Sequence, residues 1–240
     1  MKKKYFFILI IFFLILSYYL TSSSYKLTDN DIKEINFILK DINITKSTSK
    51  PSSGIDLIKK INLHLFKLSS TIDKSSYFGI PINESRSFSK WIKFTSPWCF
   101  DISRAAEEIY HYLGFNVRHV SVYHNKFDNL FISLFSYVNS HALLEVETDK
   151  GWMAVDPHMG IAFIDTFGNP VQTTDIIKSN LNYNKTSKMH SIFLKKHIVI
   201  YGLFSRHGGY YEPFVPFPDI IWSQFLTLSN FTSVNEKFKR

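Results

Sequence analysis

Apolar and polar residues are distributed along the chain in a way that predicts one long apolar segment, several amphipathic helices and a group of short strands. Residues 5–20 are almost wholly apolar, with Ser17 as the only small polar member. As a helix this segment is about 24 Å long, slightly shorter than the roughly 30 Å hydrocarbon core of a bilayer. Apolar residues then recur at helical intervals over 28–43 and 54–68, and the Ser-, Thr- and Lys-rich stretch 45–53 separates these two predicted helices.

A further helix is predicted to begin near Cys99. Ser96 is a suitable N-cap, and Pro97 suits the first helical position, where its missing N–H group is no loss. Apolar residues recur at helical spacing from position 102 to position 113, and Gly114 stands where helices commonly end with a glycine. Cys99 therefore falls in the first turn, near unpaired N–H groups and the positive end of the helix dipole, where a thiolate is favoured.

Strands are predicted in the middle of the chain and again towards its end. Residues 115–123, 141–147 and 152–156 have strand-like patterns, and the turn 148–151 between the last two contains a glycine. Residues 162–165 and 197–204 predict further strands, and Asp219 is a candidate cap for a short helix that runs to about residue 226. The aromatic segment 125–139 is open to interpretation as a lid, an insertion or a helix. We expect 179–188 to form an exposed loop and 210–218 to form an extended wrap.

The N-terminal apolar segment indicates a membrane anchor or an export signal. Lys2, Lys3 and Lys4 precede it and favour a cytoplasmic N-terminus, which places the rest of the chain on the non-cytoplasmic side, periplasmic or extracellular. Ser22 and Ser24 are small residues suited to a cleavage site, but no clear A-x-A motif is present. We therefore favour an uncleaved signal anchor over a cleaved signal peptide.

Length, composition and charge narrow the possible classes of protein. A chain of 240 residues with 45% hydrophobic and 17% aromatic content can bury a proper core, which excludes a disordered chain. The formal net charge of +8 includes the three flanking lysines, and the remaining excess is spread along the sequence. No nucleic-acid-binding motif is present, so we expect no nucleic-acid partner. We also expect no metal and no cofactor, because the histidines lack ligand spacing and there are no cysteine partners.

Cys99 is the only cysteine in the sequence, which excludes an internal disulfide. Two roles are open for it at this point: a reactive thiol at a helix start, or a buried cysteine that acts as a small hydrophobe. In an exported protein, an idle lone thiol is an oxidation liability. This consideration favours a functional thiol.

The predicted hairpin places a histidine beside a carboxylate. If Asp149 and Lys150 form a two-residue loop, Asp156 lies opposite Leu143, and His141 lies on the same face of the sheet as Leu143. His141 and Asp156 are then diagonal neighbours about 7–8 Å apart at the backbone, close enough for an imidazole–carboxylate hydrogen bond. A three-residue loop would break this parity.

Cys99, His141 and Asp156 together offer a nucleophile, a base and a group that orients the base. In this interpretation His141 takes the thiol proton, and Asp156 fixes the tautomer of His141. Each residue also has an ordinary alternative role, since strand histidines are often partly buried and Asp156 before Pro157 suits a turn. The backbone N–H group of Cys99 is the candidate donor to an oxyanion.

The order of these motifs resembles the transglutaminase-like superfamily of papain-like thiol enzymes. The similarity extends over about residues 97–160 and rests on Trp98-Cys99, Gly114-Phe115-Asn116-Val117-Arg118, Ser140-His141-Ala142, Gly151-Trp152 and Asp156-Pro157. It implies a Cys99–His141–Asp156 triad on an α+β, papain-like core in which the cysteine-bearing helix packs on an antiparallel sheet. The superfamily includes transglutaminases, cysteine proteases, peptide amidases and inactive relatives, so the resemblance implies the machinery more firmly than the substrate.

With this resemblance, the chain divides into an N-terminal signal anchor or signal peptide (1–24), a helical N-terminal extension (25–85) and a transglutaminase-like domain with a C-terminal wrap (86–240). We expect an exported, cysteine-dependent acyl transferase, amidase or peptidase that acts on a protein, peptide or other amide-bearing substrate. The alternative is a catalytically silent binding or scaffolding domain in cell-envelope or polysaccharide assembly. Trp98 and Arg118 are candidate substrate-binding residues, with core packing and a surface ion pair as their respective alternatives.

Overall fold

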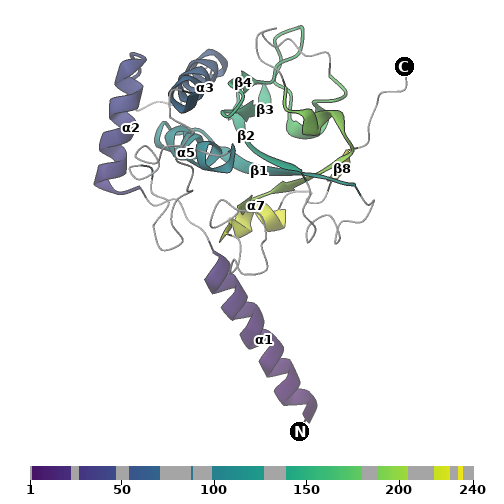
Figure 1. Cartoon of the computed structure of the whole chain (residues 1–240). Helices are drawn as coiled ribbons and strands as arrows, with labels where there is room; N and C mark the ends of the chain where they lie inside the picture. Colours follow the sequence, from purple (N-terminus) through teal and green to yellow (C-terminus); the bar gives the residue numbers. More distant parts are fainter. Residues whose placement is uncertain are drawn as a thin grey trace.

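A computed structural model of the chain shows an α+β protein in which helices cover an antiparallel sheet (Figure 1). The structure describes residues 2–22, 27–46, 54–70, 88, 99–126, 139–179, 189–204, 219–227 and 232–234. The α+β class predicted from the sequence is therefore confirmed.

The helices form where the apolar periodicity predicts them. They are α1 (Lys2–Thr21), α2 (Asp29–Asp41), α3 (Ile55–Ser70), α5 (Cys99–Tyr112) and α7 (Trp222–Thr227), with short 3-10 helices η1 (Thr173–Asp175) and η2 (Ser191–Leu194). A capping box starts α2: the Thr28 hydroxyl accepts a hydrogen bond from the Asp31 N–H group, and the Asp31 carboxylate accepts one from the Thr28 N–H group.

In the described part of the chain, six strands form one sheet in the order β4-β3-β2-β1-β5-β8, with every neighbouring pair antiparallel. Their bounds are β1 Val117–His124, β2 Ser140–Thr148, β3 Gly151–Asp156, β4 Ile161–Ala162, β5 His197–Tyr201 and β8 Thr232–Val234. A separate short pair joins β6 (Leu203–Phe204) to β7 (Asp219–Ile220). The predicted hairpin strands 141–147 and 152–156 correspond to β2 and β3.

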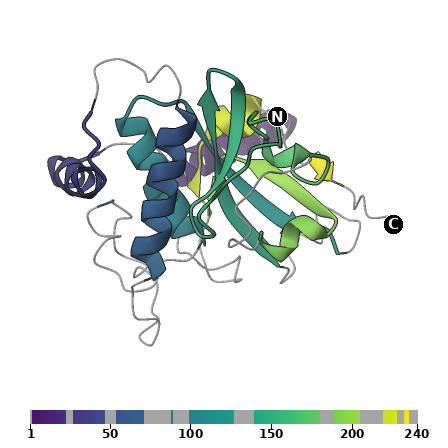
Figure 2. The same cartoon turned by 90° about the horizontal axis from the view of Figure 1, so that it is seen from above.

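Both faces of the sheet are covered. Seen from above, α2, α3 and α5 lie to one side of the sheet, and the green segments that contain η1 and η2 lie to the other (Figure 2). Buried residues of α2, α3 and α5 share one hydrophobic cluster with Leu144, Val146 and Val155. Alternate residues of the strands, such as Leu143 and Ala154, face a second cluster that contains Phe193. The helices predicted as an N-terminal extension thus pack into the same core as α5. The predicted boundary at residue 85 lies outside the described residues.

Two details of the C-terminal half differ from the prediction. The single strand predicted over 197–204 is interrupted at Gly202, which has φ +70° and whose backbone lies so close to α7 that a Cβ atom would approach the Ile221 carbonyl oxygen to 2.7 Å. The predicted helix cap at Asp219 is wrong, because Asp219 belongs to β7, where it pairs with Phe204 of β6, and the helix begins at Trp222. The predicted loop and wrap at 180–188 and 210–218, and the aromatic segment 127–138, lie outside the described residues.

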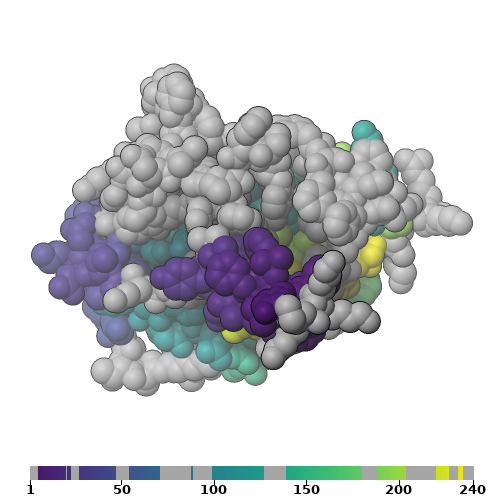
Figure 3. Space-filling view, turned by 90° about the horizontal axis from the view of Figure 1, so that it is seen from below, coloured from purple at the N-terminus to yellow at the C-terminus, as the bar shows by residue number. Residues whose placement is uncertain are grey.

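Helix α1 projects away from the body of the protein (Figure 1), and its purple side chains stand in front of the body when the molecule is seen from below (Figure 3). Its large apolar side chains from Tyr5 to Tyr19 are exposed. Its C-terminal end contacts α7, where Trp222 Nε1 donates a hydrogen bond to Thr21 Oγ1 (3.1 Å) and the Tyr18 and Trp222 rings are 5.6 Å apart. Within the part of the chain that the structure describes, no helix is both long enough and apolar enough to cross a membrane.

Candidate active site

Cys99 is the first residue of α5 and is partly exposed. One turn further along the helix, the Ser103 hydroxyl donates a hydrogen bond to the backbone carbonyl of Ala142 (3.0 Å). This bond ties the start of the cysteine-bearing helix to β2, the strand that carries His141. The helix ends as predicted, with Gly114 at φ +86° and the Phe115 N–H group bonded to the Tyr110 carbonyl. Ser96, Pro97 and Trp98 lie outside the described residues.

The hairpin has the register that the sequence predicts. Thr148 pairs with Gly151 and Leu144 pairs with Val155, so the loop contains two residues. His141 and Asp156 therefore lie on one face of the sheet, and His141 Nε2 is 2.6 Å from Asp156 Oδ2. Both side chains are buried. The predicted histidine–carboxylate contact is confirmed.

Asp156 is fixed by contacts on both its side chain and its backbone. Its second oxygen, Oδ1, accepts a hydrogen bond from the Met159 N–H group (3.0 Å) in the turn that follows β3. Its backbone carbonyl accepts a hydrogen bond from Asn62 Nδ2 (3.3 Å) on α3, and Asn62 is fully buried. Asn62 was not among the residues predicted from the sequence. The available signal was a polar residue on the apolar face of α3, next to Ile61.

The Cys99 thiol also acts on the His141 imidazole, since its hydrogen-bonding and charge effects both raise the pKa of the ring. Because Asp156 engages Nε2, Nδ1 is the nitrogen left for the thiol. Burial, the largest single influence, lowers the pKa of His141, but the charge and hydrogen bond of Asp156 and the contact with Cys99 raise this pKa and together bring it to about 10. The imidazolium form, which is the form that pairs with a thiolate, is thus favoured at neutral pH.

Three more aromatic side chains surround the His141 ring. His190 stacks on it, with ring centroids 4.1 Å apart and planes that differ by 5°. Phe193 and His158 approach it edge-on, with centroid distances of 6.1 and 6.0 Å. Neither His158 nor His190 was assigned a role from the sequence, and His190 lies beside a polar stretch with no strand or helix pattern.

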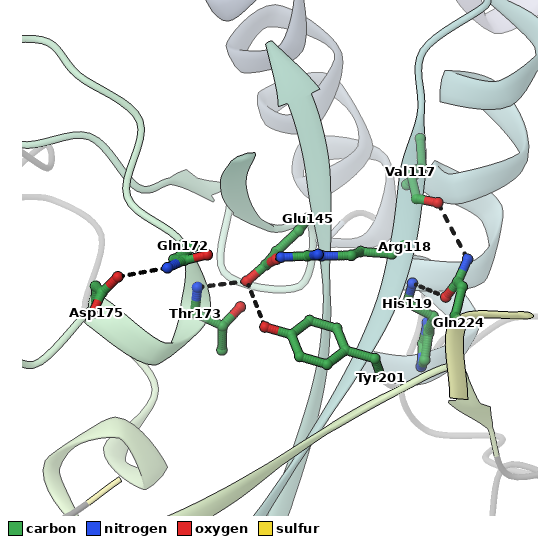
Figure 4. A network of polar contacts seen from close by, with 9 residues as sticks. All are labelled: Val117, Arg118, His119, Glu145, Gln172, Thr173, Asp175, Tyr201 and Gln224. Carbon is green, nitrogen blue, oxygen red and sulfur yellow. Dashed lines mark hydrogen bonds and ion pairs between the residues drawn. The ribbon is translucent and has the colours of Figure 1, made fainter. Parts of the chain in front are cut away.

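Arg118 lies in the interior and not at the surface, on the same face of the sheet as His141. Its Nε atom donates a hydrogen bond to Glu145 Oε2 (2.6 Å), and its guanidinium carbon lies 4.1 Å from the Trp152 ring centroid and 4.5 Å from that of Tyr201. Glu145 also accepts hydrogen bonds from the Thr173 N–H group (2.6 Å) and the Tyr201 hydroxyl (3.4 Å), so three partners converge on one carboxylate (Figure 4). A substrate-binding role for Arg118 stays a prediction.

Among the described residues, no group of three or more His, Cys, Asp or Glu side chains is arranged to hold a metal ion. No model of a known protein family matches the sequence, and a search of curated proteins finds no match either. The functional argument therefore depends on the geometry of Cys99, His141 and Asp156.

Proposed function

We propose that this protein is an exported thiol enzyme that acts on an amide or related acyl group through Cys99. One observation carries the proposal: the buried His141 imidazole is bonded to Asp156, and Cys99 is near enough to raise the pKa of the same ring. These residues come from α5, β2 and the end of β3. The ordinary roles of a buried cysteine, a strand histidine and a turn aspartate do not require these three side chains to lie together.

The proposed reaction begins when the Cys99 thiol proton passes to His141 Nδ1 and the sulfur bonds to the acyl carbon of the substrate. The carbonyl oxygen becomes negative, and the backbone N–H group of Cys99 is its candidate donor, since first-turn N–H groups have no partner within the helix. As the C–N bond breaks, His141 returns the proton to the leaving amine, and a thioester remains on Cys99. Water or a second amine then gives a proton to His141, attacks the thioester carbon and releases the thiol.

The proposal includes membership of the transglutaminase-like superfamily with its papain-like core. Three features support it: the cysteine begins the helix that packs against β1 and β2, the histidine lies at the start of β2, and the aspartate ends the neighbouring antiparallel strand. Trp98, which contributes to the resemblance, is in the part of the chain that the structure does not describe. The substrate expected on these grounds is a protein, a peptide or another amide-bearing molecule.

A labelling experiment tests the proposal before any substrate is known. Because Cys99 is the only cysteine, alkylation by iodoacetamide reports on it alone. We expect the folded chain to react about tenfold faster near neutral pH than the same chain unfolded in urea, because an imidazolium beside a thiol favours the nucleophilic thiolate. The His141→Ala variant is expected to lose this advantage.

A matched control is His111→Ala, in the last turn of α5 and therefore at the opposite end of the helix from Cys99. This variant should react at the wild-type rate. Slow alkylation of the wild-type protein that does not respond to His141→Ala would overturn the proposal. That outcome would favour the catalytically silent binding or scaffolding domain.

The proposed location is a membrane, with α1 as the anchor and the domain on the non-cytoplasmic side. The exposed apolar side chains from Tyr5 to Tyr19 suit a lipid surface, and Lys2, Lys3 and Lys4 suit the headgroups beside it. Thr21, at the end of α1, is buried against the domain and accepts a hydrogen bond from Trp222. These contacts favour an anchor that is retained over a signal peptide that is removed.

The location predicts that the full chain floats with phospholipid vesicles in a density gradient. Replacing Leu9 and Phe13 with lysine should abolish flotation, because each charge costs about 3 kcal/mol within the apolar layer. The control is Leu63→Lys, at an exposed apolar position on α3. A wild-type chain that stays in the vesicle-free fraction, whether as a monomer or as an oligomer joined through α1, would contradict the proposed location.

A further inference from the structure

His190 is placed over His141 by the short helix η2. It stands immediately before η2, and its Nδ1 atom accepts a hydrogen bond from the Ile192 N–H group (3.3 Å). Phe193, within η2, is fully buried in the hydrophobic cluster on this side of the sheet and meets the His141 ring at 89°. The buried Phe193 thus fixes η2, and η2 holds the His190 ring parallel to the His141 ring at 4.1 Å.

The contacts of His190 favour its neutral form. A nitrogen that accepts a hydrogen bond carries no proton, so the neutral ring has its proton on Nε2. Protonation of Nδ1 would break the bond from Ile192. It would also bring two positively charged rings face to face whenever His141 is an imidazolium.

Most of the surrounding charges also favour the neutral form of His190. Burial, followed by the charge of His141, lowers the pKa of His190 to about 4; Asp156 opposes this shift, whereas His158 and Lys195 add to it. A neutral aromatic ring therefore covers His141 at neutral pH. Such a ring stabilises a cation stacked on its face.

We propose that His190 is a positioning residue for the Cys99–His141 pair. Its neutral ring fixes the plane in which His141 Nε2 meets Asp156 and Nδ1 meets Cys99, and it stabilises the imidazolium that forms when Cys99 loses its proton. The inference rests on the proposed function, because it assigns His190 to the same site. His190 itself transfers no proton and forms no bond to the substrate.

The test compares iodoacetamide alkylation of Cys99 in the wild-type chain, His190→Ala and His190→Phe. Loss of the ring in His190→Ala should slow alkylation near neutral pH by about fivefold, the size expected for one partly desolvated ring–cation contact. His190→Phe keeps a ring on His141 and should restore most of the rate. His111→Ala again serves as the histidine control.

The pH profile provides a readout that loss of packing alone would not change. As the pH falls towards 4, His190 of the wild-type chain gains a charge that opposes the His141 imidazolium, so alkylation should fall more steeply than in His190→Phe. Proton NMR gives a second readout, since the His141 Nε2 proton should exchange with water faster in His190→Ala. Circular dichroism over the same range shows whether each variant stays folded.

The outcomes separate this inference from the proposed function. Fast alkylation that depends on His141 and is unchanged in rate and pH profile by His190→Ala would overturn the role of His190 and leave the proposed function standing. Slow alkylation that is independent of His141 would overturn both. If His190→Ala does not fold, an identical pH profile for the wild-type chain and His190→Phe would overturn the inference.

Discussion

Replacing Asp156 with asparagine is expected to lower the pKa of His141 from about 10 towards 6.5, and to slow the proposed amide turnover by roughly 10⁴-fold. The amide has no negative charge to hold the imidazolium. The asparagine oxygen, Oδ1, can still accept the hydrogen bond from the Met159 N–H group. In this orientation the asparagine NH₂ group faces His141 Nε2. The imidazole must then carry its proton on Nδ1, the nitrogen that has to receive the proton of Cys99.

The measurement is an NMR titration of His141, joined by a pH–rate profile once a substrate is found. In the proposed mechanism, His141 below its pKa is the imidazolium that protonates the leaving amine; above this pKa the ring is neutral and the step fails. The proposed mechanism therefore predicts that the wild-type chain stays active up to about pH 10 and that the variant loses activity at lower pH. Asp149→Asn, at the exposed tip of the same hairpin, is the control. A variant in which His141 still titrates near 10 would contradict the role given to Asp156.

The hairpin shows how much of the site the sequence could predict. The two-residue loop and the alternation of side chains along a strand are local rules, and together they placed His141 beside Asp156 without any knowledge of the rest of the fold. The end of α5 was also predictable from a local signal, because Gly114 adopts the left-handed conformation at which the helix ends. Such features depend on a few neighbouring residues, which is why a single sequence was sufficient to find them.

The supports of the site depend instead on contacts between distant segments. Asn62 reaches Asp156 across 94 positions in the chain, and His190 reaches His141 across nearly fifty. No periodicity encodes these distances, because they follow from how α3 and η2 pack on opposite faces of the sheet. The break at Gly202 has the same origin, since it depends on the close approach of α7. Asn62 at least interrupts an apolar helix face, whereas nothing around His190 distinguishes it in the sequence.

Replacing Arg118 with alanine is expected to destabilise the fold by about 3–5 kcal/mol, because it leaves a buried charge without its partner. Glu145 has no exposed surface, and Arg118 is only 8% exposed. The remaining partners of the carboxylate are the Thr173 N–H group and the Tyr201 hydroxyl, and neither carries a compensating positive charge. Urea denaturation of the full chain measures the loss. Lys150→Ala, at the exposed tip of the hairpin, should change stability by less than about 0.5 kcal/mol.

A double variant separates two contributions to the loss of stability: the unpaired charge of Glu145 and the lost packing of the Arg118 side chain. Arg118→Met with Glu145→Leu removes both charges and keeps apolar bulk between Trp152 and Tyr201, so it should recover much of the stability lost in Arg118→Ala. Recovery of stability in the double variant would show that Arg118 has a structural role. Unchanged stability of Arg118→Ala, together with a raised KM for an anionic substrate, would instead support the substrate-binding role. The stacking on two rings favours the first outcome, because it leaves the guanidinium between aromatic faces and already bonded to Glu145.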